Sequence, residues 1–221
     1  MRRALLATAA LLLFSRLALA GQTLDGPSAL RALLVEGHQP MQLERVDRLS
    51  GCTTTECSVQ FDGLAIVPKT RTLRSGRNQS IRVLEHRSPG SPALPDMDWT
   101  PTEAYAVSLD GRRWGSCMEF SHSGVGRSGT FQRWTSIILL PWRGDHPGLA
   151  AHRLVGYWAA CDQLVAGAAV GQGRLGLVQP SGASGLGLVQ YRCDSRGCKP
   201  EGRPRPVAVV KQGEGTFLTI D

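Results

Sequence analysis

The stretch that decides the fold runs Ala104-Tyr-Ala-Val-Ser-Leu109, Asp110-Gly111, Arg112-Arg-Trp-Gly-Ser-Cys-Met-Glu-Phe120. Apolar residues recur on both sides of Asp110-Gly111, and an Asp-Gly pair readily adopts the positive φ angles of a type I′ turn. The stretch therefore predicts an antiparallel hairpin in which Leu109 pairs with Arg112 and Val107 with Trp114. In that register one face would carry the core side chains Tyr105, Val107, Trp114, Met118 and Phe120.

Similar patterns recur along the chain. Residues 57–67, with Asp62-Gly63 in the middle, predict a second hairpin of the same kind. The pentapeptide Leu-Gly-Leu-Val-Gln occurs at 175–179 and 186–190, and it predicts two similar strands of one hairpin, since two copies are too few for a repeat architecture. Further strands are expected at 130–140, closed by Pro141, and in a final pair at 207–210 and 216–220.

One helix is expected near the N-terminus. Asp25-Gly26-Pro27 is a typical helix start, leucines then fall on one helical face, and Gly37 is a plausible end. Residues 150–166 fit either a helix or a strand, and the internal Gly156 favours a strand. We therefore expect a mainly β protein. Residues 21–221 would form a single antiparallel β-sandwich or barrel-like domain with one short N-terminal helix, bridged by disulfides.

Residues 1–20 have the pattern of a cleavable export signal. Arg2 and Arg3 precede an apolar run over residues 4–14, and Ala18-Leu-Ala20 offers the small residues that a signal peptidase accepts. The run is well short of the roughly 20 apolar residues that span a bilayer, and Arg16 follows it. We expect a periplasmic or extracellular protein with no membrane span.

All six cysteines follow the export signal, and an even number in an oxidising compartment indicates disulfide bonds. The first two cysteines enclose four residues, and so do the last two, so each pair is expected to close a small ring. Zinc is the alternative, but neither pair has the two-residue spacing common in structural zinc sites. The expected bridges are Cys52 to Cys57, Cys117 to Cys161, and Cys193 to Cys198.

Composition narrows the class of protein. A chain that is 42% hydrophobic and 19% charged is neither collagen, coiled coil nor wholly disordered. The formal charge is +7, and one basic cluster stands out: Lys69, Arg71, Arg74, Arg77, Arg82 and Arg87. The cluster lacks interleaved aromatic residues, so we expect no nucleic-acid partner. A solvated strand face, or a patch for an acidic partner or anionic envelope, accounts for it.

Motifs for catalysis or cofactor binding are weak. Gly124-Val-Gly-Arg-Ser-Gly129 and Gly171-Gln-Gly-Arg-Leu-Gly176 fit the dinucleotide glycine pattern, but neither convincingly follows a strand and opens a helix, so both predict turns. Ser121-His-Ser123 suggests a serine nucleophile, although no Gly-x-Ser-x-Gly elbow is present. A catalytic carboxylate pair is invisible in a sequence, because its separation is spatial.

We expect no metal and no cofactor. His146 and His152 are six residues apart and lack the His-Glu-x-x-His arrangement, so both are expected in loops or on the surface. Asp96, Asp98 and Glu103 offer oxygen ligands to calcium but lack the spacing of a calcium loop, and turn capping explains them better.

Binding is the function that remains after this elimination. Trp99 and Trp142 lie beside prolines and are the tryptophans expected to be exposed for stacking, whereas Trp114 and Trp134 are expected in the core. The glycine-rich segment 121–129 is the candidate contact loop, with His122 and Arg127 as its polar contacts.

We therefore expect a non-catalytic binder: an inhibitor, an immunity-type protein or another envelope interaction protein. Its partner would be another protein or an envelope polysaccharide. The alternative is a hydrolase or carbohydrate-binding module acting on cell-wall or other polysaccharide. An exposed cleft with two carboxylates would favour the enzyme, and a flat or protruding loop surface would favour the binder.

Protein recovered from the producing cells should begin at Gly21 and stay soluble after osmotic release, because the signal is cleavable and position 21 is not a lipid-accepting cysteine. N-terminal sequencing checks this. A chain that begins at Met1 in the membrane fraction would contradict it.

Overall fold

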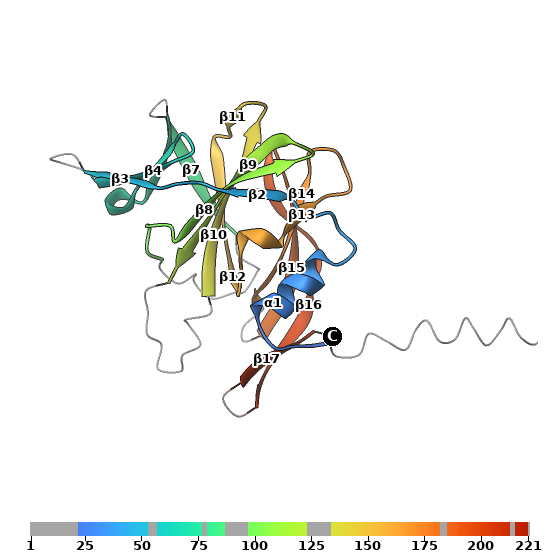
Figure 1. Cartoon of the computed structure of the whole chain (residues 1–221). Helices are drawn as coiled ribbons and strands as arrows, with labels where there is room; N and C mark the ends of the chain where they lie inside the picture. The colour runs from blue at the N-terminus through green and yellow to red at the C-terminus, as the bar shows by residue number, and fades with distance from the viewer. Residues whose placement is uncertain are drawn as a thin grey trace, which may run out of the picture.

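The computed structural model describes residues 22–52, 57–76, 79–86, 97–122, 134–181, 185–212 and 215–220. Within these ranges the protein is mainly β with one α-helix, as predicted, and Figure 1 shows this arrangement. No helix in the described part of the chain is long and apolar enough to cross a membrane.

The elements of the N-terminal half are β1 (Gln22–Leu24), α1 (Pro27–Val35), β2 (Gln42–Arg45), β3 (Leu49–Cys52), β4 (Cys57–Phe61), β5 (Leu64–Val67), the 3-10 turn η2 (Pro68–Thr70), β6 (Thr72–Ser75), β7 (Ser80–Glu85) and β8 (Glu103–Leu109). The elements of the C-terminal half are β9 (Arg112–Ser121), β10 (Trp134–Arg143), β11 (His146–Pro147), β12 (Ala150–Tyr157), the 3-10 turn η4 (Cys161–Gln163), β13 (Leu164–Ala166), β14 (Gly173–Ser181), β15 (Gly185–Asp194), β16 (Gly197–Gln212) and β17 (Gly215–Ile220).

Strand β12 is the branch point of the sheet. One edge pairs with β10, and the pairing continues antiparallel through β9 and β8 to β2. The other edge pairs first with β7, in parallel, and then with β14 through Tyr157 and Val178. From β7 the sheet continues to β3, and from β14 it continues through β15, β16 and β17 to β1. The parallel β7–β12 pair makes the sheet mixed, whereas the sequence predicts an antiparallel one.

An isolated bridge brings distant parts of this sheet together. Pro40, just before β2, pairs with Val165 of β13, and β13 pairs with β14. The sheet therefore curls around part of its own core, although the described strands are not continuously closed.

The core is divided into three clusters. The first lies inside the curl and includes Ile137 and Leu139 of β10, while Ile138 and Leu140 of the same strand face the second cluster, beneath β4 to β7. The third lies between α1 and the sheet formed by β14 to β17 and β1. Because successive side chains of a strand point to opposite faces, β10 can be buried on both sides. Burial of each large apolar side chain stabilises the fold by about 1.5–3 kcal/mol.

Several expected elements are confirmed. Asp62 and Gly63 have φ of 51° and 70°, and Asp110 and Gly111 have 52° and 72°, as type I′ turns require. The repeated pentapeptides lie in β14 and β15, which form one hairpin. The helix, the final strand pair and the strand over the first part of 150–166 are also present.

The predicted core face of the β8–β9 hairpin is confirmed for Tyr105, Val107 and Trp114, which lie in or against the first cluster, but it is wrong for Met118 and Phe120. Leu109 does pair with Arg112, but Val107 pairs with Gly115, because a β-bulge adds one residue to β9. An extra residue reverses the alternation of side chains beyond it. Trp114 therefore faces the first cluster, whereas Met118 and Phe120 face the second.

The predicted end of the next strand at Pro141 is also wrong. Strand β10 continues to Arg143, and Pro141 pairs with Gly115. The ladder between β10 and β12 ends at Leu139, so the missing N–H of Pro141 interrupts no bond there. Residues 130–133 lie outside the described ranges.

Two of the three expected disulfides are present. Cys117 joins Cys161 with Sγ atoms 2.02 Å apart, and Cys193 joins Cys198. Both sulfurs of the first bridge are buried in the first cluster, where the bond ties β9 to η4. Cys52 and Cys57 are cross-strand neighbours in β3 and β4, but their side chains lie outside the described part of the structure.

Removing the Cys117–Cys161 bridge should cost more stability than removing the Cys193–Cys198 bridge. The first bridge spans 44 residues and the second 5. Loop-closure entropy predicts losses of about 4 and about 2 kcal/mol for the Cys117→Ala, Cys161→Ala and Cys193→Ala, Cys198→Ala variants. Urea unfolding of the two variants measures the difference. Equal losses, or a larger loss from the small ring, would contradict the expectation.

Candidate functional site

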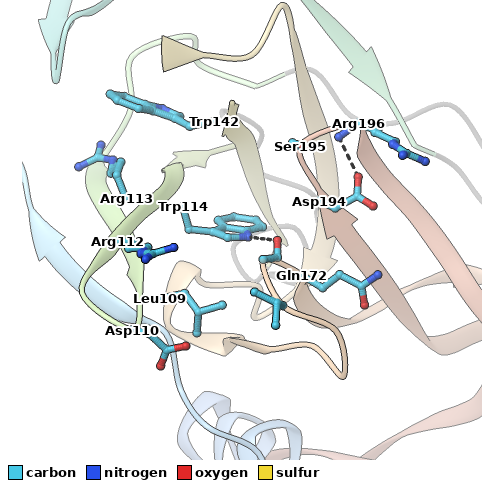
Figure 2. Close-up of a pocket in the computed structure, with 12 residues that line it drawn as sticks. Leu109, Asp110, Arg112, Arg113, Trp114, Trp142, Gln172, Asp194, Ser195 and Arg196 are labelled. Atoms are coloured by element: carbon cyan, nitrogen blue, oxygen red, sulfur yellow. Dashed lines mark hydrogen bonds between the residues drawn. The ribbon is translucent and has the colours of Figure 1, made fainter. Parts of the chain in front are cut away.

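A hollow of about 750 Å³ lies where four chain segments meet (Figure 2). These segments are the β8–β9 turn with the start of β9, the end of β10, the loop before β14, and the β15–β16 turn. We call it the first hollow. Its size falls within the range of small-molecule and peptide sites.

Trp114 lies in the middle of this hollow and holds one wall in place (Figure 2). Its indole Nε1–H donates to the carbonyl of Gly171 at 2.9 Å. Gly173 allows the close approach of this wall, since a Cβ there would lie 2.8 Å from the indole ring. Trp114 is therefore a core residue, as predicted, and it also holds the loop before β14 in place.

The opposite rim is the short turn Asp194–Arg196. Asp194 Oδ1 accepts the backbone N–H of Arg196 at 2.8 Å, and the Cys193–Cys198 bridge closes the base of the turn. Arg143 Nε donates to the carbonyl of Ser195 at 3.2 Å, which fixes the turn to the end of β10. The rim is therefore restrained before any ligand binds.

A partly buried polar cluster supports the rim formed by β9 and β10. The Arg113 guanidinium pairs with Asp62 and lies 4.6 Å from the centre of the Trp142 ring. Ser116 Oγ donates to Asp62 at 2.9 Å and accepts the Trp142 Nε1–H at 3.2 Å. Burial lowers the pKa of Arg113 from its ordinary value, while Glu44 opposes that shift. Cation–π contact and ion pairing thus fix Trp142, which is half-buried in β10.

Two other arginines in the hollow are free to bind a ligand. Arg112 and Arg196 are exposed, and among the described residues neither side chain has an ion pair or hydrogen bond. In Figure 2 Arg112 lies beside Trp114. Asp110 is on the rim, where it accepts Gln39 Nε2 at 3.1 Å.

Two further hollows continue from the first. The second, about 420 Å³, shares Trp142 with the first and includes Leu149. The third, about 450 Å³, shares Asp62, Gly63, Ser75 and Gly76 with the second and includes Leu49. We call the three hollows together the groove.

Exposed aliphatic side chains mark each part of the groove. Val170 in the first hollow is fully exposed, Leu149 in the second is 61% exposed and Leu49 in the third is 70% exposed. The other large exposed apolar side chains of the described structure are Val209 and Val210, on β16. A series of exposed apolar groups beside polar rims is typical of an interaction surface.

The candidate contact loop 121–129 lies mostly outside the described residues, and so does Arg127. His122 is described and half-buried, with Nε2 3.1 Å from Ser136 Oγ. Ser136 also accepts Arg153 Nε at 3.3 Å, and it is fully buried. His122 therefore belongs to a buried polar network away from the groove, and the contact-loop hypothesis stays a prediction.

The expected surface position of His152 is wrong, whereas His146 is exposed. His152 is 3% exposed in β12, where its Nδ1 lies 2.6 Å from His86 Nε2 and its Nε2 has no partner. The ring packs against Gly197, where a Cβ would lie 2.6 Å from it. Burial, and secondarily His86, lowers the pKa of His152 to about 4. Burial also lowers the pKa of His86.

The acidic residues weighed for calcium have other partners. Glu103 pairs with Arg45 at 2.8 Å, and Asp98 Oδ1 accepts the backbone N–H of Thr100 at 3.0 Å. Asp96 lies outside the described residues. The described ranges hold no group of three His, Cys, Asp or Glu side chains placed to share a metal.

Sequence reasoning missed most of the groove. Arg112 and Arg113 follow the Asp-Gly turn, and Asp194–Arg196 lies inside the predicted small ring. In the sequence these positions are predicted only as parts of turns and strands. A signal was available, because charged residues at a hairpin tip and inside a disulfide ring are held outward by rigid backbone.

The chain matches no protein-family profile, no curated protein and no solved structure. Any function must therefore be inferred from the groove itself.

The His86–His152 pair predicts a specific dependence of stability on pH. The folded state holds His152 neutral down to about pH 4, while the unfolded state takes up a proton near pH 6.5. Stability should therefore fall as the pH is lowered from 6.5 toward 4, and this residue contributes about 2–3 kcal/mol of the loss.

Urea unfolding at neutral and acidic pH tests this expectation. His152→Gln should reduce the difference between the two conditions, whereas His146→Gln, at the exposed histidine of β11, should leave it unchanged. An identical pH dependence in all three proteins would show that His152 is protonated normally in the folded state.

Proposed function

We propose that the protein acts by non-catalytic binding, and that the groove holds an extended segment of a partner polypeptide. The observation that carries the proposal is the coincidence of three adjoining hollows with the exposed Leu49, Leu149 and Val170. Adjoining hollows suit an elongated ligand better than a compact one. The prediction of an exported protein places this partner in the periplasm or outside the cell.

The aliphatic side chains favour a polypeptide over a polysaccharide. Sugars bind mainly through hydrogen bonds and through stacking on aromatic rings, and they gain little from isolated leucine or valine side chains. Trp142 is the aromatic residue shared by two hollows, and Arg113 lies over its ring. Apolar partner side chains would cover Leu49, Leu149 and Val170.

The arginines of the first hollow indicate that the partner segment is acidic. The side chains of Arg112 and Arg196 form no ion pair or hydrogen bond among the described residues. The carboxylate of Asp194, in contrast, already accepts the backbone N–H of Arg196 within its own turn. Carboxylates of the partner would pair with these arginines, and arginine and tryptophan are the residues most often found at binding hot spots. We therefore expect an acidic segment with interspersed aliphatic residues.

A rigid binding surface supports this function. The disulfide at the base of Asp194–Arg196 and the Trp114–Gly171 hydrogen bond hold the walls of the first hollow. A surface that is ordered beforehand loses less conformational entropy on binding.

A polysaccharide hydrolase is the second candidate, because Asp110 and Asp194 both line the first hollow. Each carboxylate, however, has a local role. Asp194 caps the turn at Arg196, and Asp110 occupies the Asp-Gly turn and accepts Gln39. Both carboxylates therefore stabilise turns, and neither needs a catalytic role to explain its position.

Site-specific photocrosslinking in the producing cells tests the proposal. A benzophenone amino acid at Val170 and, separately, at Leu149 should capture the same polypeptide, because both positions lie in one groove. The same group at Val209, an exposed valine on β16 outside the groove, is the matched control and should not capture it.

The Arg112→Ala variant should weaken binding of the captured partner by at least about tenfold, as a hot-spot residue would. Arg203→Ala removes an exposed arginine of β16 outside the groove and should have little effect. Equal capture from Val209, capture of carbohydrate alone, or measurable turnover of a polysaccharide would overturn the proposal.

A further inference from the structure

The second hollow of the groove extends from the surface to the hydrophobic core. It lies between the β10–β11 hairpin and the β4–β5 and β6–β7 turns, and Ile81 is part of its lining. Ile81 is only 3% exposed and belongs to the second core cluster. Leu149, which is 61% exposed, lies at the same hollow. The hollow is therefore apolar both at its base and at its rim.

The alternation of side chains along β10 decides which residues form its wall. Leu140 belongs to the second cluster, so Trp142, two residues further on, points to the same side of the strand. Pro147 pairs with Trp142 across the β10–β11 hairpin and shares this face. Arg143 and His146 form the neighbouring pair, so their side chains point to the opposite face. The wall that this hairpin gives to the second hollow is therefore an indole beside a proline ring, without a charge.

Trp142 is held in place and still has surface available to a ligand. Its Nε1–H donates to Ser116 Oγ at 3.2 Å, and the Arg113 guanidinium lies 4.6 Å from the ring centre. Arg113 lines the first hollow but neither of the other two, and Figure 2 shows it with Trp142 at the rim of the first hollow. The indole surface that borders the second hollow is therefore not the surface that Arg113 covers.

Polar groups around the second hollow already have partners within the protein. The carboxylate of Asp62 is paired with Arg113, and the backbone N–H of Gly148 donates to the carbonyl of Pro141 at 3.2 Å. A polar ligand group would have to compete with these contacts, whereas an apolar group would cover Leu149 and Trp142. The chemistry of the hollow therefore favours an apolar side chain of the partner.

Closely packed backbone sets the shape of the hollow. A Cβ at Gly148 would lie 2.6 Å from the carbonyl oxygen of Pro141, and one at Gly76 would lie 3.2 Å from the carbonyl oxygen of Gly63. These glycines let the surrounding turns approach one another, so the walls are formed before a ligand binds. A preformed pocket loses little conformational entropy on binding.

We propose that the second hollow is the anchor pocket for one aromatic side chain of the bound polypeptide, with the aromatic ring against Trp142 and beside Leu149. The hollow measures about 420 Å³ and has a planar wall, so a large flat ring fills it better than a leucine side chain, which would leave part of the wall without contacts. This inference rests on the proposed function and adds a sequence requirement to the partner segment.

Selection of random linear peptides on the purified protein by phage display tests the inference without knowledge of the natural partner. Peptides that bind the wild type and bind Arg112→Ala at least about tenfold more weakly are assigned to the groove. These peptides should share one aromatic residue. Replacement of that residue by leucine in a synthetic peptide should weaken binding at least about tenfold, as measured by fluorescence anisotropy.

A variant that fills the hollow shows whether the aromatic residue binds there. Gln79 is exposed and lines the hollow, and only its backbone carbonyl is needed to accept the N–H of Ser75 at 2.9 Å. Gln79→Trp should weaken the aromatic peptide at least about tenfold and remove most of the difference between the aromatic and leucine peptides, because the two changes act on one pocket. Val209→Trp, at an exposed position of β16 outside the groove, is the matched control and should bind like the wild type.

Two results would overturn the anchor pocket and leave the proposed function standing: groove-binding peptides with no preference for an aromatic residue, or equal effects of Gln79→Trp and Val209→Trp. Failure to select any groove-binding peptide would overturn the proposed function, and the anchor pocket with it. Both substituted positions are exposed, and thermal unfolding of the variants confirms that they are folded.

Discussion

The β-bulge between β8 and β9 is the constraint on which both the core and the groove depend. Across it Ser108 pairs with Arg113 and Val107 with Gly115, so β9 contains one more residue than its partner. The extra residue is Trp114, which turns into the first core cluster and holds Gly171. Beyond it the alternation of side chains is reversed, and Phe120 faces the second cluster. Gly115 is required here, because a Cβ would lie 2.7 Å from the carbonyl of Leu140.

Double-sided burial of β9 and β10 extends the effect of this constraint. One face of β10 holds Ile137 in the first cluster, and the other holds Ser136 and Ile138 on the side of the second cluster. The two strands cannot slide relative to each other by one residue without exchanging every side chain between clusters. The register of β9 against β10 therefore fixes the position of Trp114 in the first hollow of the groove. The same register also fixes the hydrogen bond between Arg153 and Ser136 on the other face of β10.

Local chemistry accounts for the features that the sequence predicts well. Asp62-Gly63 and Asp110-Gly111 form the expected turns because their φ angles depend on two adjacent residues. The bulge at Trp114 and the pairing of β7 with β12 depend on contacts between distant residues, and no local pattern specifies them. The same reason explains the error at His152, whose burial follows from the approach of His86, 66 residues earlier in the chain. The groove arises from such distant contacts, so apart from its tryptophans, Trp114 and Trp142, most of its residues are predicted in the sequence only as parts of turns and strands.

The basic cluster between Lys69 and Arg87 also shows why a count of charges does not locate a binding surface. Arg74 lies in β6 and borders the third hollow of the groove, whereas Arg71 and Arg82 border a separate hollow beside β7. Arg112 and Arg113 are adjacent in the sequence, yet Arg113 is held by Asp62 and Trp142 while Arg112 has no such partner in the described structure. The strand alternation sends neighbouring arginines to opposite faces, and the carboxylates that the fold brings to each face decide which of them are neutralised. The charge available for a ligand is therefore set by tertiary pairing, and it is concentrated at the few guanidinium groups that the fold leaves unpaired.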